Sequence, residues 1–342
     1  MKHLQALAGI AISLVCGYLA VRGVEWSAVW AAMGRVSLLA LLEAMACLGV
    51  LFLLRAYRWQ RFVEPLQPLP LGPFFSATLI GFMANDVLPL RVGELVRAYA
   101  LAHLTQVRVS AALATAVLER VWDAILISLL LIGALSRFPL PVWLARTNLL
   151  ILGGCVVSLL GGWWLVRQGE AGLTWLPPRL ATLVGHFIGG LRALRSVSLV
   201  VWTLLLSLAI WLALAAYYWV LLRACGFALP VEAALMVMVL TVLGAALPAA
   251  PSFVGTFQYA TVLALSFFSV SKEEALGFSI VAHLAQILPV TIAGLIALVQ
   301  ARLPLWPSRL IPARAEALHA PASSGEAEPD APRPALRKHH SR

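Results

Sequence analysis

The sequence predicts an all-α polytopic membrane protein with about six full transmembrane helices and two broken, re-entrant helical hairpins. Of its 342 residues, 61% are hydrophobic and only 12% are charged, and the mean hydropathy is +0.91. Several apolar runs reach the ~20 residues that a helix needs to cross about 30 Å of hydrocarbon. Two other apolar stretches are interrupted by proline and polar residues, which indicates helices that break within the membrane.

Three spans are expected in the first half of the chain. They cover Leu4–Val21, about Val36–Leu54 and Val109–Leu135, with a short polar connection from Arg22 to Arg35 before the second span. Leu4–Val21 is expected to be a retained helix, because no small-residue cleavage site and polar mature segment follow it.

A first re-entrant hairpin is expected between the second and third spans. Phe74–Leu90 is apolar but short, and Asn85, Asp86 and Pro89 interrupt it. Val92–Thr105 then reads as an amphipathic helix. We expect Asn85 and Asp86 to cap the broken helix, because backbone groups freed at membrane depth need hydrogen-bond partners.

Three more spans and a second broken hairpin are expected in the other half of the chain. The spans cover Asn148–Val166, Val197–Leu222 and Ala275–Val299, and a basic interfacial region runs from Arg167 to Arg195. Glu232–Phe268 is apolar but is cut by the sequence LPAAP at residues 247–251. This interruption favours a broken hairpin over two clean spans.

The two interruptions resemble each other. Residues 89–94 read PLRVGE and residues 251–256 read PSFVGT, so both contain Pro-x-x-Val-Gly. Pro89 and Gly93 mark the first break, and Pro251 and Gly255 mark the second. In the predicted topology the two segments enter from opposite faces, which is typical of inverted-repeat transporters whose broken helices form the substrate site.

The basic residues predict that both termini are cytoplasmic. Lys2 and the basic collar of Arg55, Arg58 and Arg61 fall on the same side as the basic loops and the tail, and the collar is expected to set this topology. The net charge of +10 is expected to face anionic lipid headgroups, and no nucleic-acid partner is expected. Residues 1–303 form the predicted transmembrane domain, and residues 304–342 form a predicted disordered cytoplasmic tail.

Residues 81–123 hold many ionisable side chains beside apolar runs. Such groups cost about 2.5–3.5 kcal/mol each at membrane depth, so a sequence that keeps several is expected to use them. Glu119 and Asp123 are four residues apart on one helix face, and Glu119 is expected near the bilayer midplane. The candidate substrate-binding residues are Arg91, Glu94, Arg97, Glu119, Arg120, Asp123, Thr256 and Gln258.

Two interpretations of these residues remain open. Arg91, Arg97 and Arg120 suit a lipid phosphate, and the carboxylates would hold these arginines, bind an ammonium headgroup or carry a coupling proton. Alternatively, the charges form a structural network that fastens the first hairpin to the span over residues 109–135. Thr256 and Gln258 either line the site from the second half or make interhelical hydrogen bonds.

The motifs resemble those of a known family. The runs LPLRVGELVRAY at residues 88–99 and ALATAVLERVWD at residues 112–123 resemble the flippase-like membrane family whose best-known member is the transmembrane half of lysylphosphatidylglycerol synthase. The run PSFVGTFQ at residues 251–258 is similar to the second motif of that family, which is usually glycine-rich and ends in glutamate. Here Ser252 and Phe253 replace glycines, and Gln258 stands in place of the glutamate.

The resemblance covers roughly residues 5–300 and implies a bacterial cytoplasmic-membrane protein that moves a lipid between leaflets. It implies an anionic or lipid-linked substrate, such as an aminoacyl-phosphatidylglycerol, a polyprenyl-phosphate sugar or a hopanoid-type lipid. The soluble aminoacyltransferase domain of the full synthase has no expected counterpart, because only 42 residues follow Gln300. Synthase activity is therefore not expected.

Two other classes of function compete with translocation. The first is a membrane-embedded enzyme acting on a lipid headgroup, which the sequence disfavours because it lacks an Asp-rich metal motif and a nucleotide loop. The second is a non-transporting partner of an envelope-lipid biosynthetic enzyme. No cofactor or metal is expected, since the four cysteines have no CxxC spacing and the histidines His186 and His283 are isolated.

Overall fold

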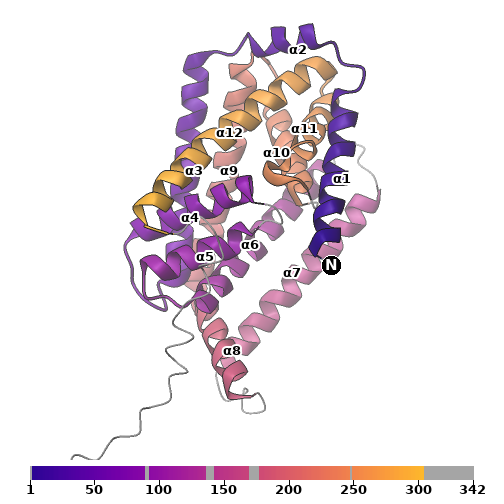
Figure 1. Cartoon of the computed structure of the whole chain (residues 1–342). Helices are drawn as coiled ribbons and strands as arrows, with labels where there is room; N and C mark the ends of the chain where they lie inside the picture. Colours follow the sequence, from indigo (N-terminus) through magenta and orange to yellow (C-terminus); the bar gives the residue numbers. More distant parts are fainter. Residues whose placement is uncertain (1, 89–91, 136–141, 169–176, 247–248, 304–342) are drawn as a thin grey trace, which may run out of the picture. The chain divides into compact units, whose positions relative to one another are not determined.

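The computed structural model describes residues 2–88, 92–135, 142–168, 177–246 and 249–303. These residues form twelve α-helices and two short 3-10 helices, and they contain no β-strand, so the all-α class is confirmed (Figure 1). The α-helices are α1 (Lys2–Val21), α2 (Trp26–Met33), α3 (Leu38–Val63), α4 (Leu71–Val87), α5 (Gly93–Leu104), α6 (Val109–Leu135), α7 (Val142–Gln168), α8 (Pro178–Gly190), α9 (Val197–Ala224), α10 (Val231–Ala246), α11 (Thr256–Ser266) and α12 (Lys272–Gln300). The 3-10 helices are η3 (Arg192–Arg195) and η4 (Pro251–Phe253).

Four helices of the described chain are long and apolar enough to cross a membrane: α3, α7, α9 and α12. A fifth span is reached if α1 and α2 count as one, although they are bent by 91°. Six were expected, and the difference lies in α6. This helix has the predicted bounds and 27 residues, but Glu119, Arg120 and Asp123 keep it out of the apolar class.

The expected polar connection from Arg22 to Arg35 is wrong, because Trp26–Met33 is helical. The segment reads WSAVWAAM and is itself apolar, with Val29 and Ala32 buried on one face. Val29 packs with Ala20 of α1 and Leu276 of α12. The basic region from Arg167 to Arg195 likewise contains a helix, α8.

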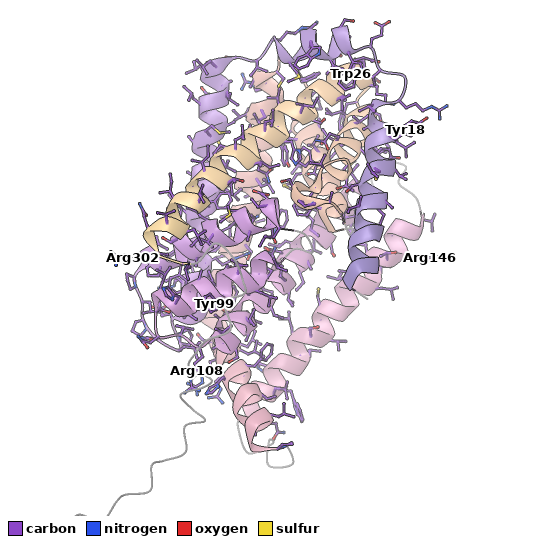
Figure 2. All side chains as sticks on the ribbon, in the orientation of Figure 1. Tyr18, Trp26, Tyr99, Arg108, Arg146 and Arg302 are labelled. Atoms are coloured by element: carbon purple, nitrogen blue, oxygen red, sulfur yellow. The ribbon has the colours of Figure 1, made fainter. Side chains whose placement is uncertain are left out.

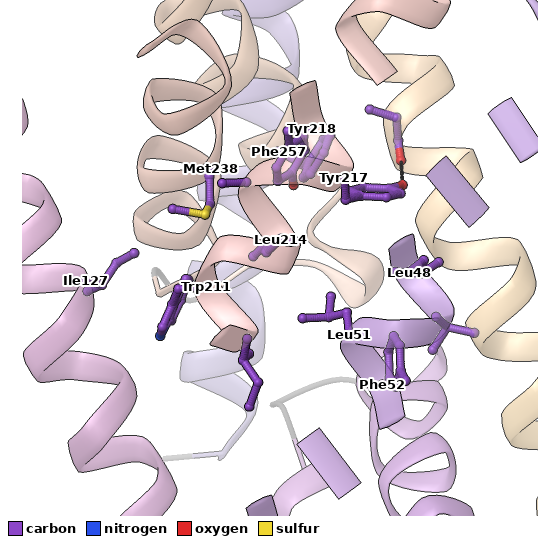
Figure 3. Close-up of a cluster of buried hydrophobic side chains, with 14 of the residues drawn as sticks. Leu48, Leu51, Phe52, Ile127, Trp211, Leu214, Tyr217, Tyr218, Met238 and Phe257 are labelled. Atoms are coloured by element: carbon purple, nitrogen blue, oxygen red, sulfur yellow. Dashed lines mark hydrogen bonds between the residues drawn. The ribbon is translucent and has the colours of Figure 1, made fainter. Parts of the chain in front are cut away.

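The main apolar core lies between α3, α9, α10 and α12. Figure 3 shows Leu51 and Phe52 of α3 near Leu214 and Tyr217 of α9. The hydroxyl of Tyr217 donates to the carbonyl of Ala282 in α12 at 3.3 Å, so this buried polar group has a partner. Lipid tails are as apolar as this core, and close packing therefore supplies most of the attraction between the helices.

Helices α3 and α9 pack along their length in antiparallel directions. At one end, the Ser37 amide donates to the Ala224 carbonyl at 2.8 Å. Further along, Arg58 of α3 donates to Ser207 of α9 at 2.7 Å. Because α4 follows the carboxyl end of α3 and α10 follows the carboxyl end of α9, the two short-helix pairs begin at opposite ends of this antiparallel pair.

Loops that the predicted topology places on one side are also neighbours in the structure. Figure 2 shows Trp26 near one end of the helix bundle and Arg108 toward the other end. Contacts at the Trp26 end join Lys272 Nζ to the Arg22 carbonyl at 2.7 Å, and contacts at the Arg108 end join that side chain to His186 at 3.3 Å. The cytoplasmic position of the termini stays a prediction.

The break after α4 is confirmed, and a side chain caps it as expected. The Gly93 amide, at the start of α5, donates to Asn85 Oδ1 at 2.8 Å. Helices α4 and α5 approach so closely that a Cβ atom on Gly81 would lie 2.6 Å from the Cβ of Arg97. Glycine at this position is therefore required for the hairpin. Pro89 and Arg91 lie outside the described residues.

The break between α10 and α11 is confirmed as well, and its backbone is unusual. Pro251 begins η4, and Gly255 precedes α11 with φ 88°. Ser252 and Phe253 both have left-handed φ values, 56° and 58°, which favour glycine. The two residues that replace the glycines of the resembling family thus keep a glycine-like backbone, at a cost of about 1–2 kcal/mol each.

Candidate functional site

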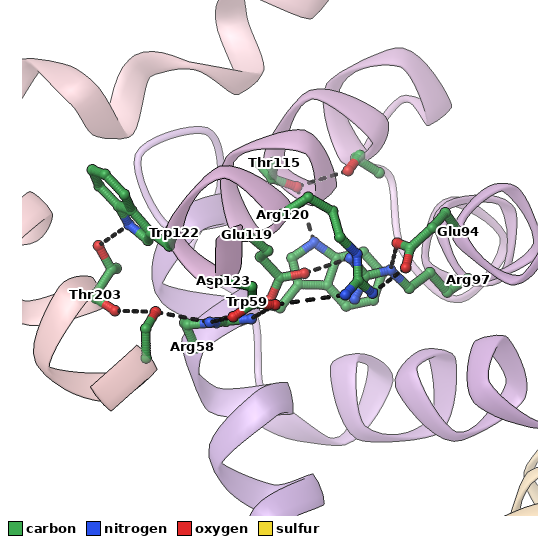
Figure 4. A network of polar contacts seen from close by, with 12 residues as sticks. Arg58, Trp59, Glu94, Arg97, Thr115, Glu119, Arg120, Trp122, Asp123 and Thr203 are labelled. Atoms are coloured by element: carbon green, nitrogen blue, oxygen red, sulfur yellow. Dashed lines mark hydrogen bonds and ion pairs between the residues drawn. The ribbon is translucent and has the colours of Figure 1, made fainter. Parts of the chain in front are cut away.

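A network of charged side chains joins α3, α5 and α6 (Figure 4). Its centre is Glu119 on α6, whose side chain is only 1% exposed. One oxygen lies 2.5 Å from Arg97 Nη2, and the other lies 3.4 Å from Arg58 Nε. One carboxylate therefore links α6 to arginines from two different helices.

Arg58 is the deepest cation of the network, so the expectation that it belongs to a basic collar that sets topology is wrong. Its side chain is 2% exposed and donates to both oxygens of Asp123, at 2.6 and 3.2 Å. It also donates to Ser207 Oγ. Helix α3 continues beyond the expected end at Leu54 as far as Val63, so Arg58 lies within the helix bundle.

A signal for Arg58 exists in the sequence. The buried side chains of α3 recur at Leu48, Leu51, Arg58 and Phe62. Arg55 completes this series with alternating steps of three and four residues, which is the spacing of one helix face. Two arginines on an otherwise apolar helix face predict that their guanidinium groups face other protein groups and not water.

The other end of the network reaches the surface. The side chain of Arg120 is 46% exposed and that of Glu94 is 31% exposed, and the two form an ion pair. Glu94 also pairs with Arg97 Nε at 2.7 Å. Helix α5 is too short to cross a membrane. Burial would raise the pKa of Glu94, but the neighbouring arginines outweigh burial and lower this pKa below its usual value.

Two tryptophans fix the helices that carry the network. Trp59 Nε1 donates to Thr115 Oγ1 at 2.9 Å, which joins α3 to α6, and Trp122 Nε1 donates to Thr203 Oγ1 at 3.1 Å, which joins α6 to α9. The guanidinium of Arg97 lies 4.7 Å from the ring centre of Trp59. The guanidinium of Arg97 therefore pairs with Glu94 through Nε and with Glu119 through Nη2, and it lies over the ring of Trp59. These contacts hold Arg97 in one position.

A second polar cluster surrounds the break before α11. The Gly255 amide donates to Gln258 Oε1 at 2.7 Å, and the other end of the same amide side chain lies 2.9 Å from His283 Nδ1. His283 Nε2 lies 2.7 Å from the Ser252 carbonyl. All three contacts are hydrogen bonds if the imidazole is neutral with its proton on Nε2. His283 then donates from Nε2 to the Ser252 carbonyl and accepts at Nδ1 from the Gln258 side-chain amide.

The two breaks touch each other. Ser252 Oγ donates to the Asp86 carbonyl at 2.7 Å, which connects η4 to the end of α4. The carboxylate of Asp86 accepts from Thr291 Oγ1 of α12 at 3.2 Å. The side chain of Asp86 therefore contacts α12 and does not cap α4 as Asn85 does.

The structure brings together five of the eight predicted site residues in the ion network: Glu94, Arg97, Glu119, Arg120 and Asp123. Gln258 lies in the cluster at the second break, beside Thr256, whose hydroxyl donates to the Phe253 carbonyl at 3.0 Å. Arg91 lies outside the described residues. Arg58 belongs to the network although it is not among the predicted site residues, and His283 is not isolated as expected. That these residues bind substrate stays a prediction.

The described residues contain no group of three or more His, Cys, Asp or Glu side chains arranged to hold a metal ion. All four cysteines are free.

Comparison with known proteins identifies the family. No curated protein matches the chain. Residues 6–294 match the family described as the lysylphosphatidylglycerol synthase TM region. The matched residues include both helix breaks and the whole ion network. This match covers most of the 342 residues, and the chain therefore belongs to the lysylphosphatidylglycerol synthase transmembrane-region family.

Proposed function

We propose that this protein is a lipid translocase that moves an anionic or lipid-linked headgroup between the leaflets of a bacterial cytoplasmic membrane. The observation that carries the proposal is the contact between the two helix breaks, from Ser252 to Asp86. Discontinuous helices that meet in this way form the substrate sites of many secondary transporters. The first break leads directly into α5, whose Glu94 and Arg97 belong to the ion network.

The direction of the helices supports an inverted relation between the two hairpins. The pair α4–α5 begins at one end of the antiparallel pair α3–α9, and the pair α10–α11 begins at the other. Each contains the Pro-x-x-Val-Gly sequence at its break. Two re-entrant hairpins that start on opposite sides and touch at their breaks would let one site open to either leaflet in turn.

Within this proposal the buried and exposed charges have different roles. Arg58 and Arg97 each pair with Glu119, and these pairs hold α3, α5 and α6 together. Arg120 and Glu94 are exposed enough to exchange their mutual ion pair for a phosphate and an ammonium group of a lipid headgroup. In this proposal Arg58, Arg97 and Glu119 have the structural role, and Arg120 and Glu94 have the lipid-binding role.

Translocation requires no covalent change of the lipid, and the proposal assigns no catalytic residue and no cofactor. Its partners are membrane lipids. An envelope-lipid biosynthetic enzyme that supplies the substrate is a further candidate partner.

The test is leaflet exchange in proteoliposomes. Labelled anionic phospholipids, aminoacyl-phospholipids and polyprenyl-phosphate sugars are offered to the reconstituted wild type and to the variants Arg120→Gln and Glu94→Gln. We expect the wild type to move at least one class, and each variant to slow that movement by at least about tenfold, a loss of about 1.4 kcal/mol. Arg223→Gln is the matched control, because Arg223 is exposed and stacks on Trp219 away from the network.

Other outcomes separate the competing functions. No movement of any lipid class by folded wild type would overturn the proposal in favour of a non-transporting partner. Covalent change of an offered lipid would favour a membrane-embedded enzyme. A chain ending at residue 303 should retain exchange, whereas a partner that recruits an enzyme through its tail should lose its effect.

A further inference from the structure

We propose that Arg55 binds the phosphate of the translocated lipid. This inference rests on the proposed function and deepens it. Arg55 belongs to the expected basic collar, and no ion pair among the described residues includes it.

The surroundings of Arg55 give it no carboxylate within ion-pair distance among the described residues. It lies one helical turn before Arg58 on α3, and its guanidinium carbon is 5.0 Å from the ring centre of Phe82 on α4. Its Nε atom is buried and has no hydrogen-bond partner among the described residues. A cation–π contact alone does not replace the hydrogen bonds that a guanidinium makes in water.

The ion pairs around α3 leave Arg55 available for an anion. Among the described residues, Arg58, Arg97 and Arg120 all pair with the carboxylates of the ion network, those of Glu94, Glu119 and Asp123. Asp86 bonds to Thr291 and takes part in none of these ion pairs. Arg55 is therefore the one of these four guanidiniums without an ion pair among the described residues, and an unpaired charge is costly inside a membrane protein.

Arg55 is placed where a headgroup would couple the network to the first break. Phe82, on which it stacks, lies one turn before Asp86 on α4, and the Asp86 carbonyl receives the bond from Ser252. On α3, the next turn carries Arg58 and its two carboxylates. A phosphate on Arg55 would thus lie between the ion network and the segment where the hairpins meet, one helical turn from Arg58 on α3 and beside Phe82 on α4.

The unpaired guanidinium also selects among substrate classes. The phosphodiester of a lipid such as phosphatidylglycerol or a polyprenyl phospho-sugar matches the fork of donors on arginine. A lipid without a phosphate has no group for Arg55.

Binding to purified protein in detergent tests the assignment. The probes are fluorescent phosphatidylglycerol and a fluorescent diacylglycerol that lacks the phosphate. We expect Arg55→Gln to weaken phosphatidylglycerol binding by at least about tenfold, as loss of a charge-assisted contact does, and to leave diacylglycerol binding unchanged. Arg55→Lys should keep more of the binding than Arg55→Gln, and Arg223→Gln should bind both lipids as the wild type does.

The ratio between the two lipids keeps the test decisive even if a variant is less stable. A purely structural Arg55 would lower binding of both lipids alike, and Phe82→Leu would then reproduce the effect; that outcome overturns the proposal. Equal phosphatidylglycerol binding by Arg55→Gln and wild type overturns it too. Displacement of the probe by millimolar inorganic phosphate, as effectively as by short-chain phosphatidylglycerol, would assign the site to free phosphate and overturn the lipid assignment.

The two proposals fail separately. Arg55-dependent selectivity without leaflet exchange by the wild type would leave the binding site standing and overturn the translocase. Leaflet exchange of phosphatidylglycerol that is the same in wild type and Arg55→Gln would leave the translocase standing and overturn the role of Arg55.

Discussion

Glu119 is the most enclosed carboxylate of the ion network, and each of its oxygens faces an arginine from another helix. A buried ion pair contributes little net stability compared with an apolar pair, because both charges lose their hydration. Removing one partner is different, since the remaining charges stay buried without compensation. At the scale of single residues, the consequence of a substitution therefore depends on how deeply its partners are buried.

Glu119→Gln should strongly destabilise the fold. It leaves Arg58 and Arg97 with less compensation in a site that is 5% exposed or less, and breaking such pairs lowers the free energy of unfolding by about 3–5 kcal/mol. Glu94→Gln should lower it by a smaller amount, because Glu94 and Arg120 reach the surface. Denaturant titration in detergent, followed by tryptophan fluorescence, measures both; equal losses would contradict this ranking.

Gln258→Ala should destabilise the second break. The substitution removes the acceptor of the Gly255 amide and the donor to His283, which is only 7% exposed. We expect a loss of about 2 kcal/mol, because two buried polar groups lose their partner. Gln300→Ala, at the exposed end of α12, is the control and should change the thermal midpoint little. A Gln258→Ala variant as stable as this control would contradict the hydrogen-bond chain.

At the scale of elements, the hairpin of α4 and α5 depends on backbone proximity. Gly81 faces Arg97, and the Gly93 amide is held by Asn85. This packing sets the position of Arg97 and hence of its ion pair with Glu119. The local sequence thus places a charged side chain by way of a glycine on the neighbouring helix.

Gly81→Ala should separate the two helices. The new Cβ would lie 2.6 Å from the Cβ of Arg97, which is closer than real Cβ contacts, and a tight 3.0 Å from the Gly93 carbonyl oxygen. Overpacking of this kind costs about 1–3 kcal/mol, and we expect leaflet exchange to fall with it because Arg97 moves. Gly72→Ala, on the same helix with open space around it, is the matched control and should retain stability and exchange.

At the scale of the whole molecule, long-range contacts sort the loops into two ends. Ser37 and Ala224 meet at one end, where Lys272 also contacts the Arg22 carbonyl, and Arg108 meets His186 at the other. The predicted topology assigns these ends to the two sides of the membrane. It also makes the two hairpins enter from opposite sides.

Single-cysteine labelling in cells tests this assignment. In a background without the four free cysteines, Ala228→Cys should react with a membrane-impermeant maleimide added outside the cytoplasmic membrane. Gln106→Cys, which is also exposed but lies at the opposite end, should react only after the membrane is opened. Labelling of both positions from the same side would contradict the predicted topology and the inverted relation of the hairpins.

The sequence by itself determined much of the local structure. The bounds of Val109–Leu135 were predicted as they stand, because a largely apolar segment of that length, even with three charged residues inside it, satisfies its backbone in a membrane only as a helix. Asn85 and Gly93 marked the first break, and residues 251–255 marked the second. The spacing of Glu119 and Asp123 placed both carboxylates on one helix face. Helix ends and helix faces depend on neighbours along the chain, so a single sequence reveals them.

Only the tertiary structure decided which faces meet. In the structure Arg58 lies in the ion network and not in the expected basic collar, and His283 lies within hydrogen-bond distance of Gln258. It also brought Ser252 into contact with Asp86, a residue far away in the sequence. Helix packing selects these partners by shape and charge across long sequence separations, which local periodicity does not encode. The charges of the site were therefore visible in the sequence, and their pairing was settled by the packing of α3, α5, α6 and α12.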